Sequence, residues 1–377
     1  MSFKISVETS LDAFEALRTE WNELADRMDC PELFYRWEWA WLCHKHLRSG
    51  SELLILLLRE KGRLVALAPL CVVTRKALGM SARVVETIVT GHADYANLLV
   101  CASQHRRRIV RAILDWLYTN RKAWDVIDLS QLSSRDATSF HLATVTSEFP
   151  DLKAVMRPSS RAPKLDYALF PTKRRENQVH RIKSGARKLA EQGYTLTIGA
   201  ETSDDLWAAF CDLHRARWSA SPFHTREGAA FYDELRRELG RQGQVEFSYL
   251  ALHGRPVAVH FGFRDPRKIY FYMPVADSEF RNRRVGAVLA DAMVEHYATS
   301  HREFDFLRGD EDYKYWWTDD VTVNFRLLIF RRDNLAALAY NAGPAASEFL
   351  GSLAFPGLLR QRLKTLWRRS ASHTSEE

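Results

Sequence analysis

Three apolar runs separated by turn residues stand near the middle of the chain and predict neighbouring strands. They span residues 245–252, 255–264 and 268–275. Gly254 separates the first two runs, and Asp265-Pro266 separates the last two. Short gaps of this kind are typical of a tight antiparallel meander. We therefore expect three consecutive antiparallel strands here.

A helix and two more strands are predicted after the meander. An irregular basic loop at residues 281–284 precedes Gly286, and apolar residues then recur at helical spacing as far as Tyr297. Residues 304–307 predict a short strand, and residues 321–330 predict a final one. Antiparallel strands, a basic loop at the start of a helix and a further strand form a layout that can hold a pyrophosphate on the helix amides.

The same order of elements occurs earlier in the chain. Residues 53–59 and 63–73 predict a hairpin, and residues 62–66 (GRLVA) match residues 254–258 (GRPVA) at an offset of 254 − 62 = 192. A period near 190 residues indicates domain duplication rather than a solenoid. Each half alternates strands and helices, so we predict an α/β fold with a mixed sheet in each half.

The domain boundary is predicted between residues 150 and 170. Residues 131–163 predict a helix and a strand that end in a loop at 157–163, which we interpret as the hinge. The resulting domains are residues 1–160 and 161–335. A C-terminal segment, 336–377, includes an amphipathic helix at 355–369 that suits either a membrane surface or docking on the second domain.

Composition limits the class of protein. The 377 residues include 46% hydrophobic residues and 11 tryptophans, which are ample for a buried core and exclude wholesale disorder. The net charge of +7 suits anionic partners such as phosphate groups, RNA or an acidic membrane surface. Five widely spaced cysteines without a CxxC pair favour reduced thiols over a disulfide framework or a metal site. With neither a signal-like N-terminus nor a long apolar run, we expect a cytoplasmic protein, either free or at the inner membrane.

One further motif carries a family resemblance. Residues 305–317 read DFLRGDEDYKYWW, and Gly254-Arg255-Pro256-Val257-Ala258 and Gly286-x-x-Leu289 support it. Together these stretches resemble the GNAT acyltransferase superfamily, in the double-domain branch described as CelD/BcsL-like or BioF2-like, which is related to the FemAB peptidyltransferases. The resemblance covers roughly residues 3–331. It implies two tandem GNAT-like domains, each with a mixed, mostly antiparallel sheet flanked by helices, the first of them degenerate.

The resemblance implies an acyl-CoA site at the basic loop. Arg283, Arg284, Gly286 and Ala287 fit the family's phosphate loop, but Val288 stands where glycine or alanine is usual. A basic helix at residues 171–192 is either a solvated face or a contact for a polyanion. We expect no metal.

Candidate catalytic groups lie on the meander and on the motif that follows it. Strand alternation places Tyr270 and Tyr272 on one face, with Phe271 and Met273 on the other. Tyr272 could protonate a leaving thiolate or simply pack across the sheet. His260, between Ala258 and Gly262, has room beside it for a ligand, although a lone strand histidine is often structural.

The 305–317 motif supplies the remaining candidates. Asp310 or Glu311 could act as a base or anchor the substrate amine, or could form a surface salt-bridge cluster. The resemblance implies that Lys314 supports the oxyanion. The residues expected to contact substrate are Arg308, Tyr313, Trp317 and Trp218.

The function predicted from these features is transfer of an acyl group from acyl-CoA to an amine. The resemblance implies a sugar or lipid acceptor in exopolysaccharide or cell-envelope biosynthesis. A Fem-like transferase that uses aminoacyl-tRNA is the enzymatic alternative, and a catalytically inactive scaffold is the non-enzymatic one. The sequence does not define the oligomeric state.

Overall fold

The computed structural model describes residues 3–103, 105–169 and 176–342. Its strands form one 13-stranded sheet in the order β1-β2-β3-β4-β6-β13-β7-β12-β11-β10-β9-β8, with β5 against β3. The predicted helix at 355–369 and the start of the basic helix, at 171–175, lie outside the described residues. Within those residues, no helix is long and apolar enough to cross a membrane.

The strands of the first half are β1 (Lys4–Glu8), β2 (Glu52–Glu60), β3 (Arg63–Ala77), β4 (Met80–Thr87), β5 (Leu99–Val100), β6 (Val126–Ser133) and β7 (Leu152–Asp166). Those of the second half are β8 (Tyr194–Thr197), β9 (Val245–Leu252), β10 (Arg255–Arg264), β11 (Lys268–Ala276), β12 (Glu303–Asp305) and β13 (Val321–Arg331). The predicted meander and hairpin are present. The α/β fold class with a mixed, mostly antiparallel sheet is confirmed.

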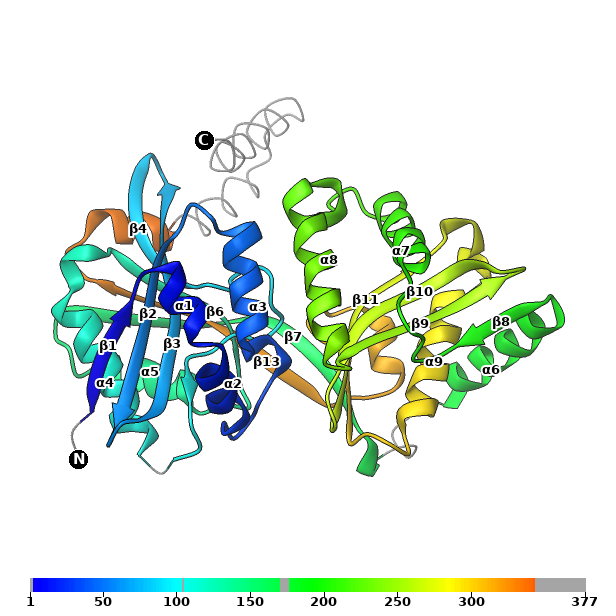
Figure 1. The fold of residues 1–377 in the computed structure, drawn as a ribbon, viewed down its shortest axis with the longest axis horizontal. Coiled ribbons are helices and arrows are strands. Elements are labelled where there is room, and N and C mark those ends of the chain that lie inside the picture. Colours follow the sequence, from blue (N-terminus) through cyan, green and yellow to red (C-terminus); the bar gives the residue numbers. More distant parts are fainter. Residues whose placement is uncertain (1–2, 104, 170–175, 343–377) are drawn as a thin grey trace.

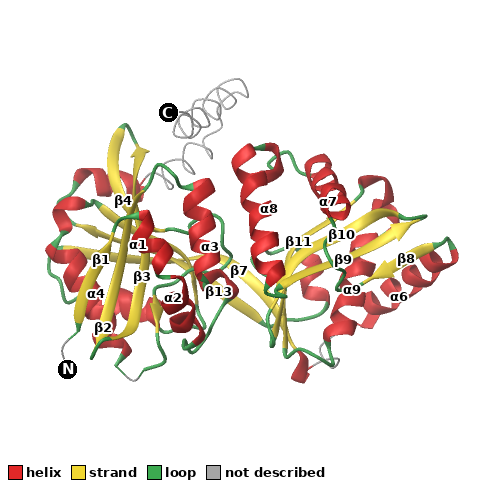
Figure 2. Ribbon diagram, in the orientation of Figure 1, coloured by secondary structure: helices red, strands yellow, loops and turns green. Residues whose placement is uncertain are grey.

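Helices cover both faces of the sheet (Figure 2). On one face lie α1 (Leu11–Ala16), α2 (Arg18–Asp26), α3 (Trp37–Leu42), α7 (Asp204–Arg217) and α8 (Arg226–Arg241). On the other lie α4 (Arg106–Thr119) and α5 (Thr138–Thr146) in the first half, and α6 (Glu176–Glu191) and α9 (Val285–Tyr297) in the second. Periodic apolar residues on each helix face the sheet, as expected for amphipathic helices.

The two halves repeat the same strand arrangement, which agrees with the sequence repeat. β1, β2, β3 and β4 are antiparallel neighbours, as are β8, β9, β10 and β11, and the β4–β6 and β11–β12 pairs are both parallel. The turns of the two matching hairpins also agree. Lys61 and Gly62 have φ of 50° and 83°, and His253 and Gly254 have 48° and 82°. Two successive positive φ values are typical of a type I′ turn, in which glycine is favoured.

The last strand of each half crosses toward the other half. β13 lies between β6 and β7, and β7 pairs with both β13 and β12. Figure 1 shows these two long strands passing between the halves. The expectation of a hinge loop at 157–163 was wrong, because this stretch is the middle of β7. Pro158 lies at a register shift and Pro163 faces the first residue of β13, positions where a missing amide is tolerated.

The halves also share a hydrophobic core. Trp39 of α3 contacts Phe231 of α8, with ring centroids 6.1 Å apart, and Phe263 of β10, at 5.3 Å. At the rim of this contact, Lys45 forms an ion pair with Glu234 of α8 at 2.7 Å. α3 and α8 lie side by side in Figure 1. The aromatic residues at 34–41 therefore belong to this core.

Candidate active site

One edge of β11 has no strand partner over its second half. Parallel pairing with β12 ends at Tyr270 opposite Asp305, whereas β10 continues along the other side as far as Ala276. The amide of Asp277 donates to the Val257 carbonyl of β10 at 2.8 Å. Because amide directions alternate along a strand, Ala276 points its N–H away from β10, and Pro274 has no N–H to offer on that side. Among the described strands, none pairs with this stretch of edge.

The unpaired edge ends beside the first turn of α9. A Cβ placed on Gly286 would lie 3.6 Å from the Cβ of Ala276. Arg284, which precedes the helix, has a left-handed φ of 55°. The first amides of a helix have no acceptor within the helix and carry a partial positive charge. The end of the β11 edge therefore lies against a position suited to an anion.

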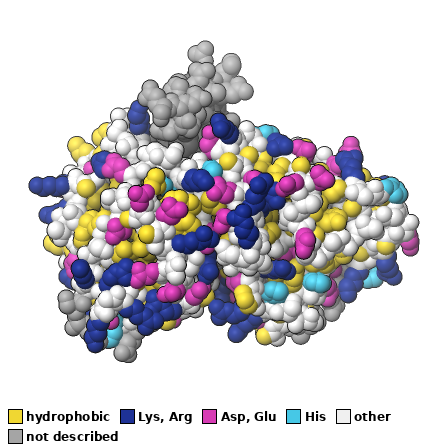
Figure 3. All heavy atoms as spheres, viewed as in Figure 1, with side chains coloured by type: hydrophobic (Ala, Val, Ile, Leu, Met, Phe, Trp, Pro, Cys, Tyr) yellow, Lys and Arg dark blue, Asp and Glu magenta, His cyan; other side chains and the backbone are white. Residues whose placement is uncertain are grey.

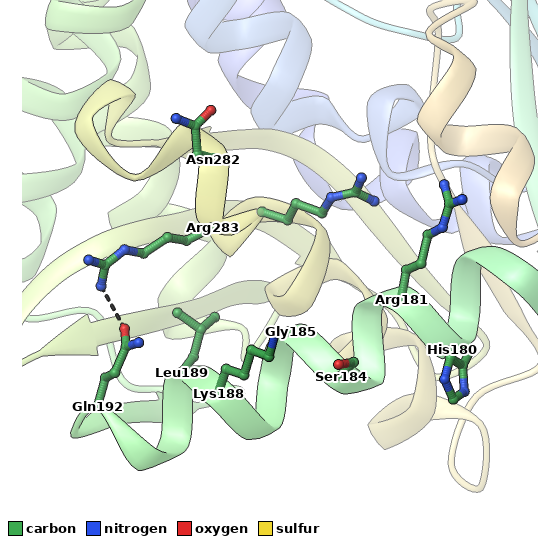
Figure 4. Close-up of a pocket in the computed structure, with 10 residues that line it drawn as sticks. His180, Arg181, Ser184, Gly185, Lys188, Leu189, Gln192, Asn282 and Arg283 are labelled. Carbon is green, nitrogen blue, oxygen red and sulfur yellow. Dashed lines mark hydrogen bonds between the residues drawn. The ribbon is translucent and has the colours of Figure 1, made fainter.

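A basic pocket of about 500 Å³ lies next to this helix start. It is lined by His180, Arg181, Ser184, Gly185, Lys188, Leu189, Gln192, Asn282, Arg283 and Arg284. Figure 4 shows α6 along one wall and the loop before α9 along the other, with Arg283 bonded to Gln192. That bond is 2.6 Å, and Arg283 also donates to the Tyr194 hydroxyl at 3.3 Å. None of these described lining residues carries a carboxylate, so their charge favours anions.

Val288 lies away from the anion position. Its side chain is buried, and its Cγ2 would be 3.8 Å from a Cβ on Gly185 of α6. The departure from the usual phosphate loop is therefore a packing feature between α9 and α6. A Cβ at position 185 would make only an ordinary contact with Val288, and its absence leaves space in the pocket wall.

At its other end, the unpaired edge begins at a β-bulge. β11 has an extra residue there: Phe263 faces Tyr270 and Phe261 faces Met273. Tyr272 therefore shares a face with both Tyr270 and Met273, which corrects the simple alternation expected from the sequence. The Tyr272 hydroxyl lies 3.0 Å from that of Tyr232 and 3.5 Å from the His92 carbonyl of the first half. Burial holds the pKa of Tyr272 well above its usual value, so the group stays protonated at neutral pH.

The first half contributes a loop, residues 91–95, to this end of the edge. Asp94 pairs with the Arg308 Nε at 2.7 Å, and Arg308 also donates to the Gly91 carbonyl at 3.3 Å. Burial raises the pKa of the Asp94 carboxyl to about 6, against the opposing charges of Arg308 and Lys314. Burial likewise lowers the pKa of His92 to about 4, so its imidazole is neutral at pH 7.

A buried charge cluster fixes the base of the edge. The Lys268 ammonium lies 2.8 Å from Glu32, 3.1 Å from Glu303 and 3.5 Å from Asp305. Burial alone would lower the pKa of Lys268, but these carboxylates raise it. Tyr95 of the first half donates to Asp305 at 2.9 Å. The cluster joins the two halves where β11 and β12 diverge.

Lys314 supports the loop after β12. Its ammonium donates to the carbonyls of Leu307 at 3.2 Å and Arg308 at 2.8 Å, and it pairs with Glu311 at 3.0 Å. These three partners match the three N–H groups of an ammonium. Asp310 instead contacts the Tyr315 hydroxyl and Arg161. The expected joint carboxylate–lysine cluster is therefore limited to Glu311 and Lys314.

Four other predicted site residues have different surroundings from those expected. Trp317 is fully buried and donates to Asp291 at 2.9 Å, so the expectation that it contacts substrate is corrected: it is a core residue. Trp218 is half exposed at the end of α7, beside Arg217, and no described contact joins it to the β11 edge. The space expected beside His260 is filled by its own imidazole, which would lie 2.3 Å from a Cβ on Gly262. Tyr313 packs on the core that contains Trp317.

Sequence comparison finds a similar protein family for the half of the chain that carries this edge. Residues 174–315 match the family model described as an acetyltransferase (GNAT) domain. Over these residues the second half is similar to acetyltransferase (GNAT) domains. No protein of curated function matches the chain by sequence. Among the described residues of both halves, no cluster has the composition of a metal site.

Solved structures extend the likeness to both halves. The chain is similar to FemX, with 11% identity, a TM-score of 0.56, and 90% of this chain and 99% of that chain covered. It is also similar to a tandem GNAT protein from the clavulanic acid biosynthesis pathway (14% identity, TM-score 0.51, 86% and 98% covered) and to L-PGS from Bacillus licheniformis (10%, 0.52, 90% and 99%). At these identities the likeness concerns the fold.

The first half lacks the open edge found in the second half. β4 pairs with β6 only from Val84 to Glu86, but the chain then returns beside β6. Ala96 bridges to Leu132 in parallel and donates its N–H to the Gln131 carbonyl at 2.9 Å. The gap between the diverging strands is thus filled by the chain itself. The same loop brings Asp94 and His92 into contact with the second half.

Sequence reasoning missed most of the residues contributed by the first half. The loop containing His92 and Asp94 is recognisable as polar, but nothing local links it to Arg308, 214 residues away. Glu32, Tyr95 and Tyr232 carry no motif. The repeat was the one available signal, because it indicates that two similar halves lie close enough to share a site.

Proposed function

We propose that this protein is an N-acyltransferase that binds acyl-CoA along the β11 edge and transfers the acyl group to an amine. The observation that carries the proposal is the continuity of three features: the bulge at Tyr272, the unpaired edge as far as Ala276, and the basic start of α9. The pantetheine arm of CoA contains amides that can pair with a strand edge. Its pyrophosphate suits helix amides backed by arginines.

The direction of the edge supports a reaction site at the junction of the halves. With phosphates at Arg283, Arg284 and the amide of Gly286, the thioester would lie toward Tyr272. The Ala287 amide, also expected from the sequence to bind the donor, already donates to the Arg284 carbonyl at 2.9 Å. The amine attacks the thioester carbonyl, an N–C bond forms, and the C–S bond breaks. Tyr272, still protonated, is our candidate to protonate the leaving thiolate.

Asp94 is our candidate base for the amine proton. Its pKa of about 6 lies nearer neutrality than that of an ordinary aspartate, as a general base requires. Asp310 and Glu311, the candidates from the sequence, are exposed and paired elsewhere. Lys314 could support the oxyanion only if the loop after β12 rearranged when substrate binds, because its ammonium already contacts Leu307, Arg308 and Glu311.

The acceptor is proposed from family resemblance alone as an amine on a sugar or lipid precursor, in exopolysaccharide or cell-envelope biosynthesis. Aminoacyl-tRNA is a second candidate donor. The four Arg and Lys side chains of the pocket and the basic face of α6 favour it, because a polynucleotide presents several phosphates. Net charge does not separate the two donors, and on the face shown in Figure 3 basic and acidic side chains are interspersed.

Calorimetry with acetyl-CoA tests the donor. Arg284→Glu is expected to weaken binding by more than the ~10-fold that one exposed ion pair supplies. Lys188→Gln, in the pocket, should weaken it less. Lys183→Gln is the matched control, because Lys183 is on the same helix but lies 4.0 Å from Glu295 and outside the pocket.

The proposal fails for acyl-CoA if the wild-type protein binds no CoA, or if Arg284→Glu and Lys183→Gln bind alike. RNA that copurifies with the wild type and is lost from Arg284→Glu would favour the tRNA donor. If neither CoA nor RNA binds, the catalytically inactive scaffold becomes the favoured alternative.

A further inference from the structure

A buried polar chain lies directly behind the bulge in β11. His260 and Glu246 are completely buried on neighbouring strands, and the His260 Nδ1 lies 2.5 Å from the Glu246 carboxylate. The second carboxylate oxygen of Glu246 accepts from the hydroxyls of Ser248 and Tyr297, the latter at 3.1 Å. On its other side, the His260 Nε2 lies 3.1 Å from the backbone nitrogen of Tyr272.

The two neighbours of the imidazole determine where its proton resides. A backbone N–H is only a donor, so Nε2 must accept from Tyr272 and can carry no proton. The remaining ring proton is then on Nδ1, where it donates to Glu246. Glu246 fixes this tautomer because its carboxylate is an acceptor only.

The ring is also held sterically. It stacks on Phe271, with centroids 4.5 Å apart and an interplanar angle of 4°. Any Cβ at position 262 would lie 2.3 Å from the His260 Cε1 and 2.4 Å from the Tyr270 carbonyl oxygen. Glycine at 262 is therefore required for the imidazole to reach the bulge.

The bulge needs such a partner. At a bulge, two residues of one strand face a single residue of the other, so one of them is left outside the regular ladder. Here the amide of Tyr272 receives its acceptor from a side chain instead of from the β10 backbone. A buried amide without an acceptor would cost free energy and allow the strand to shift.

We propose that His260 is a positioning residue that, oriented by Glu246, holds the bulge and thereby fixes both Tyr272 and the register of the donor edge. This inference rests on the proposed acyl transfer. His260 does not contact substrate. It acts through the Tyr272 backbone, which directs the hydroxyl toward Tyr232 and sets the start of the unpaired edge.

Two substitutions separate hydrogen bonding from packing. His260→Leu removes the acceptor, and His260→Gln restores an oxygen near the position of Nε2. With donor and acceptor at defined concentrations, His260→Leu is expected to lower kcat about 10-fold or more, with the KM for acyl-CoA within about threefold of wild type. His260→Gln should recover most of the lost kcat. His296→Leu, at an exposed position on α9, is the matched control and should leave both constants unchanged.

A spectroscopic measurement on the wild type is independent of activity. Long-range ¹⁵N–¹H correlation of labelled histidines should show His260 as the neutral Nδ1–H tautomer, with Nε2 unprotonated. Hydrogen exchange should show the Tyr272 amide as protected. A protonated Nε2 overturns the inference, as does a His260→Leu variant that is folded and retains wild-type kcat.

The inference would also be overturned if His260→Leu and His260→Gln lowered kcat equally and only in proportion to their loss of thermal stability. If His260→Leu does not fold, the inference is tested by the kcat of His260→Gln and by the tautomer of His260 in the wild type. If the wild type binds no acyl-CoA while the tautomer is as expected, the proposed function fails. The inference that His260 holds the bulge is then still supported.

Discussion

Lys314 is buried among acceptors, which determines what its replacement should do. Lys314→Met leaves two backbone carbonyls and Glu311 without their cation. We expect the free energy of unfolding to fall by roughly 1–3 kcal/mol, the usual cost of unsatisfied buried groups. Urea denaturation measures this. A variant of unchanged stability whose turnover falls by roughly 10² would instead support an oxyanion role.

Asp94 should make stability depend on pH in an identifiable direction. Its pKa rises from 3.8 to about 6 on folding, so the folded state binds the proton more tightly. The resulting stabilisation is complete below about pH 4 and is lost as pH rises through about 6.

The Asp94→Asn variant resembles the protein with a protonated Asp94 and lacks the pH dependence of stability that this carboxyl causes. Between pH 4 and 7, the stability of the wild type relative to Asp94→Asn should fall by about 3 kcal/mol, from about two pKa units. Denaturation of both proteins at a series of pH values tests this. Parallel curves would contradict it.

At the level of single residues, the sequence predicted candidate reactive groups better than it predicted which side chains are buried. Arg284 and Tyr272 were found from local patterns, and the structure places them at the two ends of one strand edge. Trp317 was expected to contact substrate, and His260 was expected to have room for a ligand beside it, but both side chains are buried in the core. Burial of a particular side chain depends on strands that are distant in sequence, so alternation within one strand could not reveal it.

Two glycines in helices should respond oppositely to the same substitution. A Cβ on Gly185 of α6 would meet only Val288 at an ordinary 3.8 Å. A Cβ on Gly228 of α8 would lie 2.3 Å from the Pro222 carbonyl oxygen. Since alanine favours a helix by about 1 kcal/mol over glycine, Gly185→Ala should raise the free energy of unfolding by up to that amount.

Gly228→Ala should instead lower the free energy of unfolding, because backbone must move to admit the methyl group. Thermal and urea denaturation of both variants provide the comparison. A destabilised Gly185→Ala would mean that α6 and α9 pack more tightly than these distances indicate. Acetyl-CoA affinity of Gly185→Ala then shows whether the space at this wall is used by the donor.

Elements were predictable where a local pattern determines them. The matching type I′ turns follow from Lys61-Gly62 and His253-Gly254 between apolar runs. β7 was mistaken for a hinge because residues 157–163 contain two prolines and two serines. Its pairing with β13, about 165 residues later in the chain, compensates for this composition, and no local pattern indicates that partner.

For the whole molecule, the exchange of β7 and β13 decides how the halves depend on one another. β13 is the last strand of the second half but pairs with β6 of the first half, from Asn324 to Phe330. Residues 1–160 and 161–335, the domains proposed from the sequence, therefore contribute strands to a common sheet. The core around Trp39 and Phe231 and the cluster around Lys268 cross the same junction.

These connections predict one cooperative unfolding transition for the described fold. Separation of the halves would expose the shared aromatic core and leave Lys268 and Glu32 as unpaired charges, both of which are costly. Hydrogen exchange at increasing urea concentration should therefore give the same opening free energy for the β2–β3 hairpin and for β9–β10. If β2–β3 opens at lower urea while β9–β10 stays protected, the halves unfold independently. The exchanged strands would then not couple the first half to the donor site.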